Sequence, residues 1–388
     1  MNHRERLKAV LKYQDYDRLP LVHFGFWTET IEEWVAQGKV PQEYLDEIRQ
    51  NPFLWCGTEV ERKIEELCGF DYNVFTVVGN PGNFAFYPPF KPEVVKELPD
   101  GTRHVLNPEG CIVAEKLGEN GRPINAIGFH VGHTLVDRKS WEEIYKPRYK
   151  VTTDRFAANQ ARLEKAVAER ETRERPLGLF VSSLAGQIRT IMGFENFVMM
   201  WGEDEELMEE IVQTTADSVF EITKMYLEHY DFNADYIWFG EDIAYKSGPM
   251  INPKKFAEIW GPNYKRITDY AKSKGVEFAI VDCDGWIDSL VPTWVNNGVE
   301  IMLPNEVGTW GGSIVPWRKE LGQKVRCCGG MRKQVFMEDK AAVDAEIERL
   351  KPLVDMGGYI PMPDHQIAPG SKLELVQYYC DRFRKTFG

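Results

Sequence analysis

The feature that most constrains the fold is a recurring strand end, where a short apolar run stops abruptly at polar residues. The clearest example is Val276–Gly285, VEFAIVDCDG. An apolar run of this length, bounded by turn residues, is typical of a buried strand that delivers polar groups to one end of a sheet. Four further runs have this form and end at Glu241-Asp242, Asn305-Glu306, Cys328-Gly329 and Asp364-His365.

Helical segments alternate with these strands from about residue 140 onward, beginning with a charged stretch over 141–170 that reads as one helix. Strand–helix alternation at intervals of roughly 25–40 residues predicts parallel βα units. Two earlier candidates, residues 21–27 and 73–78, bring the count to about eight strands. The sequence therefore predicts an α/β protein with a (β/α)8 TIM barrel. A doubly wound open sheet is disfavoured, because no Gly-rich phosphate turn follows any strand.

Residues 80–135 differ from the rest of the chain. They contain short β-rich runs separated by turn signals such as Pro99-Asp100-Gly101 and Glu119-Asn120-Gly121. This pattern predicts a β-meander. We interpret it as a β-rich insertion into the barrel, so that residues 1–388 form a single domain.

Composition and charge exclude several classes of function. The net charge of −13 and the lack of a basic face argue against nucleic-acid binding. The seven cysteines are scattered without CxxC spacing, which argues against a disulfide framework and fits a reducing compartment. No apolar run is long enough for a membrane span, and the charged N-terminus lacks the apolar core of a signal peptide. We therefore expect a cytoplasmic protein.

In a barrel, the C-terminal ends of all strands face one mouth. This expectation gathers polar residues that span 125 positions of the chain: Glu241, Asp242, Asp282, Asp284, Glu306, Cys328 and His365.

The most economical interpretation of this set is a metal site. Asp284, Glu306 and His365 would supply three ligands and leave one position open, as in a catalytic zinc site. Strand alternation places Asp282 and Asp284 on one side and Cys283 in the core. Each acid taken alone is equally well explained as a cap of the helix that follows it.

Other candidate residues are aromatic or basic. Trp27 and Trp310 lie beside predicted strand ends, where they could line an apolar pocket for substrate. His23 falls on the same side of the first strand as Trp27 and is a further candidate for substrate binding. His130 and His133 lie at i and i+3 in the insertion and are a weaker metal candidate.

At these residues the sequence resembles the uroporphyrinogen decarboxylase superfamily over nearly its whole length. The resemblance rests on four stretches: RERLKAVLKYQDYDRLPL, GEDIAYKSGPMINPKKFAEIWGPNYKRI, VDCDG and GGYIPMPDHQIAPGSKLELVQYY. It implies a (β/α)8 barrel. It also implies one of two chemistries, which are decarboxylation of a tetrapyrrole and cobalamin-dependent methyl transfer with zinc.

The decarboxylases of this superfamily carry an Arg-rich segment after the first strand. Here that segment is FGFWTETIEEW, and no arginine occurs between Arg18 and Arg49. A tetrapyrrole decarboxylase or lyase is therefore the alternative, because the acidic groups of a porphyrinogen would lack partners. The zinc motif of the methyltransferases, His-x-Cys-Gly with a later Cys, falls on Asp282, Asp284 and His365, so the positions agree and the ligand types differ.

The resemblance to the methyltransferase component of anaerobic O-demethylases implies a specific role. A carboxylate and imidazole set would leave zinc more Lewis acidic, which suits an ether oxygen. We expect a small-molecule methyl donor, an aryl methyl ether, and a separate corrinoid protein that carries the cobalamin. Asp282, Glu241 and Asp242 are the expected catalytic residues, which orient substrate or handle a proton.

Two further expectations complete this interpretation. Barrels of this superfamily are often dimeric, so a homodimer is compatible with it. A non-catalytic corrinoid-binding module is a second alternative, and the grouped strand-end acids argue against it.

Overall fold

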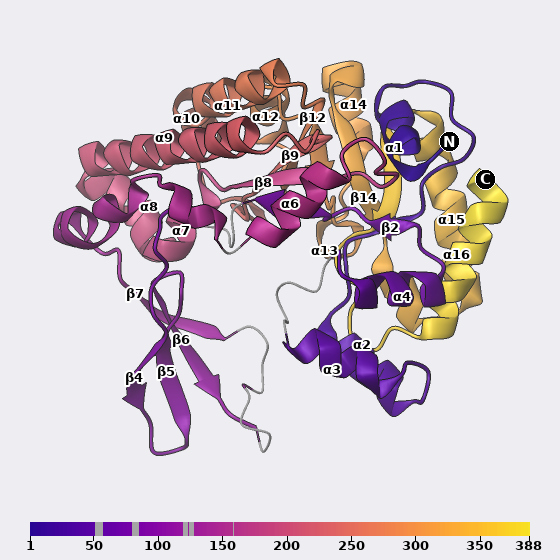
Figure 1. The fold of residues 1–388 in the computed structure, drawn as a ribbon, viewed down its shortest axis with the longest axis horizontal. Coiled ribbons are helices and arrows are strands. Elements are labelled where there is room, and N and C mark those ends of the chain that lie inside the picture. The colour runs from indigo at the N-terminus through magenta and orange to yellow at the C-terminus, as the bar shows by residue number, and fades with distance from the viewer. Residues whose placement is uncertain (51–56, 80–84, 119–122, 124–127, 158) are drawn as a thin grey trace.

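The barrel of the computed structural model is built on seven parallel strands in the order β15-β14-β13-β12-β9-β8-β3 (Figure 1). The structure describes residues 1–388 apart from 51–56, 80–84, 119–122, 124–127 and 158. The strands of this sheet are β3 (Val77–Gly79), β8 (Gly178–Ser182), β9 (Tyr236–Gly240), β12 (Phe278–Asp282), β13 (Ile301–Leu303), β14 (Arg326–Met331) and β15 (Tyr359–Pro363).

The first strand joins the two edges of this sheet. β1 (Val22–His23) pairs in parallel with β2 (Tyr72–Asn73). β2 and β3 follow one another along the chain and together form one strand of the barrel. On the other side, the N–H of Trp27 donates to the carbonyl of Ile367 at 3.1 Å, and the N–H of Ile367 donates to the carbonyl of Gly25 at 3.0 Å. Eight strand positions result, and the predicted (β/α)8 TIM barrel is confirmed.

The helices cover the outside of the barrel (Figure 1). Their bounds are α1 (His3–Leu11), α2 (Thr28–Ala36), α3 (Gln42–Gln50), α4 (Glu59–Cys68), α5 (Arg138–Ser140), α6 (Gln160–Ala168), α7 (Gly186–Met192), α8 (Phe194–Glu203), α9 (Glu205–His229), α10 (Pro253–Ile259), α11 (Gly261–Ser273), α12 (Val291–Asn296), α13 (Val307–Trp310), α14 (Ile314–Leu321), α15 (Lys340–Asp355) and α16 (Leu373–Phe387). A short hairpin of β10 (Ala244–Tyr245) and β11 (Gly248–Pro249) follows β9.

The single helix expected over 141–170 is wrong. The structure has a π-helix at Trp141–Tyr145, 3-10 turns at Lys146–Tyr149 and Thr153–Phe156, and only then α6. Pro147 has no amide donor for a continuous helical ladder. The aromatic side chains of the first two turns are buried in the body, so packing favours this broken path over a regular helix.

An aromatic floor, formed by Phe24, Phe75 and Trp238, fills the barrel beneath the strand ends. The ring of Trp238 stacks on Phe24 with centroids 6.0 Å apart and meets Phe75 edge-on at 4.9 Å. Trp238 lies on β9 and is fully buried. The barrel is therefore a packed core and not a pore, and polar groups at the strand ends sit on an apolar base.

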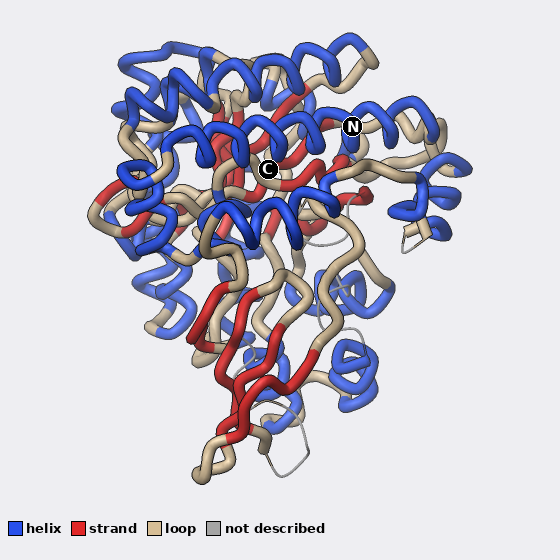
Figure 2. Tube along the Cα trace, turned by 90° about the vertical axis from the view of Figure 1, so that its left-hand side faces the viewer, coloured by secondary structure: helices blue, strands red, loops and turns tan. Residues whose placement is uncertain are grey.

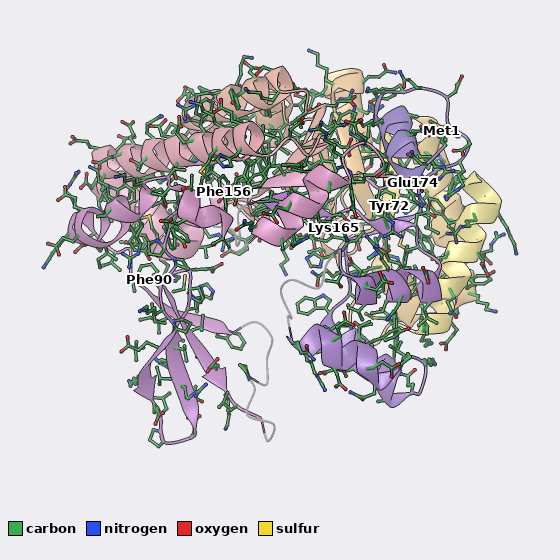
Figure 3. All side chains as sticks on the ribbon, in the orientation of Figure 1. Met1, Tyr72, Phe90, Phe156, Lys165 and Glu174 are labelled. Carbon is green, nitrogen blue, oxygen red and sulfur yellow. The ribbon has the colours of Figure 1, made fainter. Side chains whose placement is uncertain are left out.

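The expected β-rich insertion is a four-stranded antiparallel sheet in the order β4-β5-β6-β7. It projects from the body (Figures 1 and 2). Its strands are β4 (Glu93–Glu97), β5 (Thr102–Leu106), β6 (Cys111–Lys116) and β7 (Phe129–His133). Phe90 lies where this sheet meets the body (Figure 3), with its ring 5.4 Å from that of Tyr145. That residues 1–388 form a single domain stays a prediction.

Among the described residues, none of the helices combines the length and the apolar character that crossing a membrane requires.

Gly329 of β14 should be intolerant of any side chain. It has a φ of +129°, and a Cβ atom there would lie 1.7 Å from the carbonyl oxygen of Pro304. We expect Gly329→Ala to lower the free energy of unfolding by about 3 kcal/mol or more, measured by urea titration. Gly202→Ala on α8 is the matched control, because a Cβ meets nothing within 4 Å there. It should be neutral or stabilising by up to about 1 kcal/mol. Equal stability of the two variants would contradict the prediction.

Candidate functional site

Three aspartates form an acidic cluster at the mouth of the barrel: Asp242 after β9, Asp282 at the end of β12, and Asp284 two residues later. The N–H of Asp284 donates to Oδ1 of Asp242 at 3.3 Å. Oδ1 of Asp284 is buried and has no hydrogen-bond partner within the described part of the chain. The predicted convergence of these strand ends therefore occurs.

Burial and like charge keep protons on this cluster. Burial raises the pKa of Asp282 well above its ordinary value, and the carboxylates of Asp242 and Asp284 raise it further. The pKa of Asp242 is also raised, first by the enclosing protein and then by Asp284, while Arg189 opposes the shift. Closely spaced carboxylates resist ionising together, so this cluster favours the protonated form of Asp242 and Asp282.

Of the three residues expected to bind zinc, His365 and Asp284 lie close together, and Glu306 does not complete a set of three ligands. Nε2 of His365 lies 3.4 Å from Oδ2 of Asp284. Both oxygens of Glu306 accept hydrogen bonds, from the N–H of Gly285 at 2.8 Å and from Oγ1 of Thr309 at 2.9 Å. Two sets of side chains in the described residues bring three potential ligand atoms within 4.8 Å of one another. Asp284, Glu306 and His365 are not one of these sets. As arranged, these three residues do not fit a three-ligand metal site, and their metal role stays a prediction.

Glu241 is an expected catalytic residue that the structure places elsewhere. Its side chain is fully buried and accepts hydrogen bonds from Oγ of Ser183 at 2.8 Å and from the backbone N–H groups of residues 184–186 at 2.8–2.9 Å. The hydroxyl of Tyr264 donates a fifth at 2.5 Å. With its oxygens occupied, Glu241 stabilises the turn into α7, and a catalytic role for it stays a prediction.

His23 is also engaged within the protein. It is 0% exposed, its Nδ1 accepts from the N–H of Gly25 at 2.9 Å, and its Nε2 lies 3.2 Å from Glu65. Both ring nitrogens are thus used within the barrel wall, and a part of His23 in substrate binding stays a prediction. Asp364 is likewise buried, and its Oδ2 accepts from the N–H groups of Val307 and Gly308 at the start of α13.

Tryptophans stand beside the acidic cluster as expected. The ring of Trp27 lies 6.5 Å from that of His365, which also meets Phe24 of the floor edge-on at 5.7 Å. Trp310 stacks against Trp286 with centroids 6.4 Å apart, and its Nε1 is buried without a partner among the described residues. An aromatic wall with one free indole donor therefore adjoins the carboxyl groups.

Two cations at the mouth were missed by the sequence reasoning. Lys333 follows β14. Burial lowers its pKa, and the carboxylates of Asp364, Glu306 and Asp284 oppose this shift. Arg189 of α7 donates to the carbonyl oxygen of Asp242 at 2.6 Å. The only sequence signal for Lys333 was its place just after a glycine-ended strand, and Arg189 had none.

Backbone strain also gathers at the strand ends. Ser182, Asp242 and Asn305 have φ values of 112°, 42° and 51°, in the region that residues with a side chain rarely adopt. They follow or end β8, β9 and β13. Strained non-glycine residues persist where the surrounding structure holds them, and they are common at functional sites.

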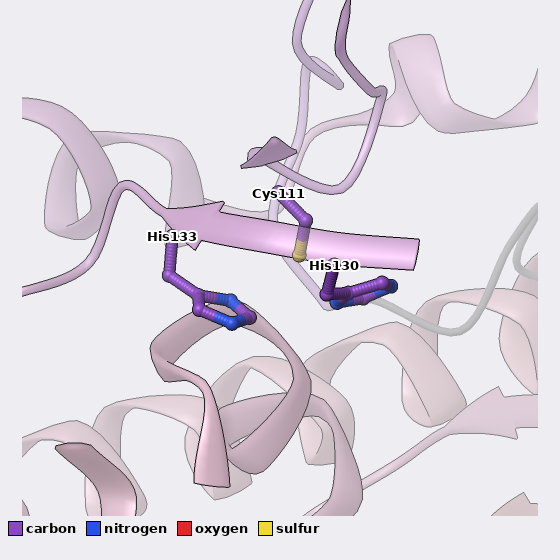
Figure 4. Close-up of side chains that lie close together, drawn as sticks. All are labelled: Cys111, His130 and His133. Atoms are coloured by element: carbon purple, nitrogen blue, oxygen red, sulfur yellow. The ribbon is translucent and has the colours of Figure 1, made fainter. Parts of the chain in front are cut away.

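Two side-chain groups bring potential metal ligands together in the described residues. One is His23 with Glu61 and Glu65, a buried set whose atoms are engaged with one another and with Asn73. The other comprises Cys111, His130 and His133 in the insertion (Figure 4). The sequence reasoning considered the two histidines and missed Cys111.

Comparison with known proteins identifies a matching family and structures with a similar fold. The sequence profile of the family Uroporphyrinogen decarboxylase (URO-D) matches residues 135–386. No curated protein sequence matches the chain. A methyltransferase from Methanosarcina mazei superposes with a TM-score of 0.63 and 17% identity over 99% of each chain. A B12-independent methionine synthase from Shewanella sp. W3-18-1 gives a TM-score of 0.48 and 13% identity, over 95% of this chain and 98% of that chain. The first superposition shows a shared fold.

The raised pKa of Asp282 predicts a pH-dependent effect on stability. Once the pH exceeds the ordinary value of 3.8, the unfolded chain ionises this group while the folded chain resists, so the folded state loses stability. Asp282→Asn removes this loss. It should stabilise the protein at pH 8 by at least about 1.4 kcal/mol, the free energy of a tenfold change in the ionisation equilibrium, and the difference should vanish below pH 4.

Urea unfolding between pH 4 and 8 measures this effect. Asp381→Asn, at an exposed position of α16, is the control with the same change of charge. An Asp282→Asn protein that is less stable than the wild type at pH 8 would show that the carboxylate is ionised and stabilised by partners.

Proposed function

The chain belongs to the uroporphyrinogen decarboxylase (URO-D) family, and within it we propose a methyltransferase that moves a methyl group from an aryl methyl ether to a corrinoid protein. The observation that carries this proposal is the cluster of acids, with the pKa of Asp282 raised, beside an aromatic wall. Both are what demethylation of an aryl ether requires, namely a surface for the ring and an acid for the leaving oxygen.

The leaving oxygen needs a proton when the bond to the methyl carbon breaks. The cobalamin of the partner supplies the nucleophile that takes the methyl group. Burial and its acidic neighbours raise the pKa of Asp282 and favour its protonated form, and we assign it the role of general acid toward the departing phenolate. Asp242, which is exposed to solvent, can pass a proton from water back to Asp282. The step then balances: the methyl group goes to the corrinoid, the leaving oxygen takes the proton of Asp282, and solvent restores that proton.

Trp27 and Trp310 are the proposed contacts for the aromatic ring. Aromatic side chains bury large apolar areas and prefer offset or edge-on contacts with another ring. The free Nε1–H of Trp310 offers a hydrogen bond to a polar substituent of the donor. Zinc held by Asp284, Glu306 and His365 stays a prediction. The proposed methyl transfer and protonation of the leaving oxygen do not depend on it.

A tetrapyrrole decarboxylase remains the alternative, and the charge of the mouth argues against it. Asp242, Asp282, Asp284 and Glu306 lie together there. A substrate that carries several carboxylates would meet repulsion from this set, and Arg189 and Lys333 are the cations placed near it. A neutral donor avoids this cost. A passive corrinoid-binding module has no use for a carboxyl group kept protonated.

The corrinoid protein would dock on an exposed aromatic strip, which we define as Phe194, Tyr245 and Trp286. These side chains are 41%, 48% and 44% exposed. The rings of Phe194 and Tyr245 lie 5.4 Å apart, and the N–H of Trp286 donates to the carbonyl of Tyr245 at 2.8 Å. Exposed aromatics in contact with one another are typical of protein interfaces. The strip leads to Trp310 in the wall.

Methyl transfer tests the proposal directly. The full chain is incubated with a reduced corrinoid protein and a panel of methyl donors, and methylation of the corrinoid is followed spectroscopically. We expect transfer from an aryl methyl ether, and on the order of 10²–10³-fold slower transfer in Asp282→Asn, because the general acid is lost. The rate should also fall as the pH rises through the raised pKa of Asp282. No transfer from any ether, with release of carbon dioxide from a porphyrinogen instead, would establish the alternative.

Substitutions in the aromatic strip test the docking surface. Phe194→Ala and Tyr245→Ala should each raise the KM for the corrinoid protein by about 10-fold, since an interface aromatic contributes on the order of 1–2 kcal/mol. Transfer to free cob(I)alamin should be unchanged, because no protein partner docks. Val95→Ala, also exposed but on β4, is the control. An equal loss with both acceptors would place these residues in substrate binding and not in docking.

A further inference from the structure

The pairing of β6 and β7 places three potential metal ligands on one face of the inserted sheet. Cys111 lies opposite His133, and Val113 lies opposite His130. The register shifts between these pairs, so Val131 is an extra residue without a partner, which makes a β-bulge. Histidines three apart on a regular strand point to opposite faces, and the bulge restores them to the same face as Cys111 (Figure 4).

The ligand atoms are already close to one another. Sγ of Cys111 and one nitrogen of each imidazole all lie within 4.8 Å of one another. In a tetrahedral site with bonds of 2.0–2.3 Å, ligand atoms stand about 3.5 Å apart, so side-chain rotation suffices to close the site. Cys111 is buried, His133 is partly buried and His130 is exposed, which leaves the group open to solvent on one side.

The surroundings leave the imidazoles available as ligands. Nδ1 of His133 is buried and lacks a hydrogen-bond partner among the described residues. Burial lowers the pKa of both His130 and His133, which favours the neutral form that binds metal, although a hydrogen bond to the backbone of Thr190 opposes the shift at His133. Sγ of Cys111 donates to the carbonyl of Thr190 at 3.3 Å, and burial raises the pKa of this thiol to about 12.

We propose that Cys111, His130 and His133 form a zinc site with an open fourth position, a site distinct from the strand-end carboxylates. One thiolate and two imidazoles are a donor set that suits zinc. A closed structural site has four protein ligands, whereas three with an open position is the arrangement of catalytic zinc. The inference goes beyond the proposed function and does not depend on it.

The site lies at the rim of the barrel mouth. Arg189 is close enough to act on the charges of Cys111 and both histidines, and its guanidinium also donates to the carbonyl of Asp242. The positive charge of Arg189 and the carboxylate of Glu109 therefore both lie close to the proposed metal ligands. An open position on the metal could bind a thiol, a carboxylate or water.

Zinc binding has a defined proton balance. Cys111 must lose its S–H proton to bind zinc. Its hydrogen bond to the carbonyl oxygen of Thr190 is then lost. A neutral imidazole binds metal without releasing a proton. Binding at pH 7 should therefore release about one proton per zinc, measurable with an indicator dye in weak buffer. Release of no proton would exclude Cys111 as a ligand.

Metal content of the full chain tests the assignment without a methyl donor or corrinoid. We expect about one zinc per chain, and a thiolate-to-cobalt charge-transfer band after Co²⁺ substitution. His130→Ala alters an exposed side chain and should weaken zinc binding by on the order of 10²-fold. Cys111→Ser should abolish the charge-transfer band. His104→Ala, on β5 of the same sheet, is the matched control and should retain both.

Three outcomes would overturn the proposal: a wild-type protein that takes up neither zinc nor Co²⁺, Co²⁺ uptake without the charge-transfer band, and zinc lost in His365→Ala but kept in His130→Ala. The last would assign the metal to the strand ends. If Cys111→Ser fails to fold, as judged by circular dichroism, the charge-transfer band of the wild-type protein decides. Loss of methyl transfer alone bears only on the proposed function.

Discussion

One buried carboxylate, that of Glu241, organises the whole mouth of the barrel. It binds three successive amides of the turn into α7, the hydroxyl of Ser183 and the hydroxyl of Tyr264 on α11. A buried charge is tolerated only when hydrogen bonds replace its lost hydration, and here five donors do so. This interaction fixes the end of β9 against α7. The next residue, Asp242, is thereby set in its strained conformation, and α7 carries Arg189 and Thr190 toward the insertion.

The electrostatics of the mouth follow from this anchoring. Asp242, Asp282 and Asp284 lie close together above an apolar floor, and burial with their mutual repulsion raises the pKa of Asp242 and Asp282. Arg189 and Lys333 lie nearby without neutralising the set. A site of this kind favours neutral, aromatic ligands and reactions in which an oxygen must be protonated as it leaves.

The sequence predicted the position of the strand ends better than their roles. Alternation along the strands predicted that Asp282 and Asp284 face one way, and counting strands predicted the barrel. Glu241 and Asp282 look alike in the sequence, as acids at strand ends. They differ because the amides of residues 184–186 face one of them, and the position of those amides depends on the tertiary fold. The burial of His23 was not predicted for the same reason, since its partner Glu65 comes from α4.

The bulge at Val131 makes the geometry of β7 depend on the number of residues and not only on their kinds. Adding one paired residue between His130 and His133, with the bulge kept, would leave the composition of the sheet almost unchanged, yet it would turn one imidazole to the opposite face. A related chain can therefore keep both histidines and the cysteine while lacking their common face. The spacing within this strand, more than the presence of its residues, is the character by which relatives of this protein should be sorted.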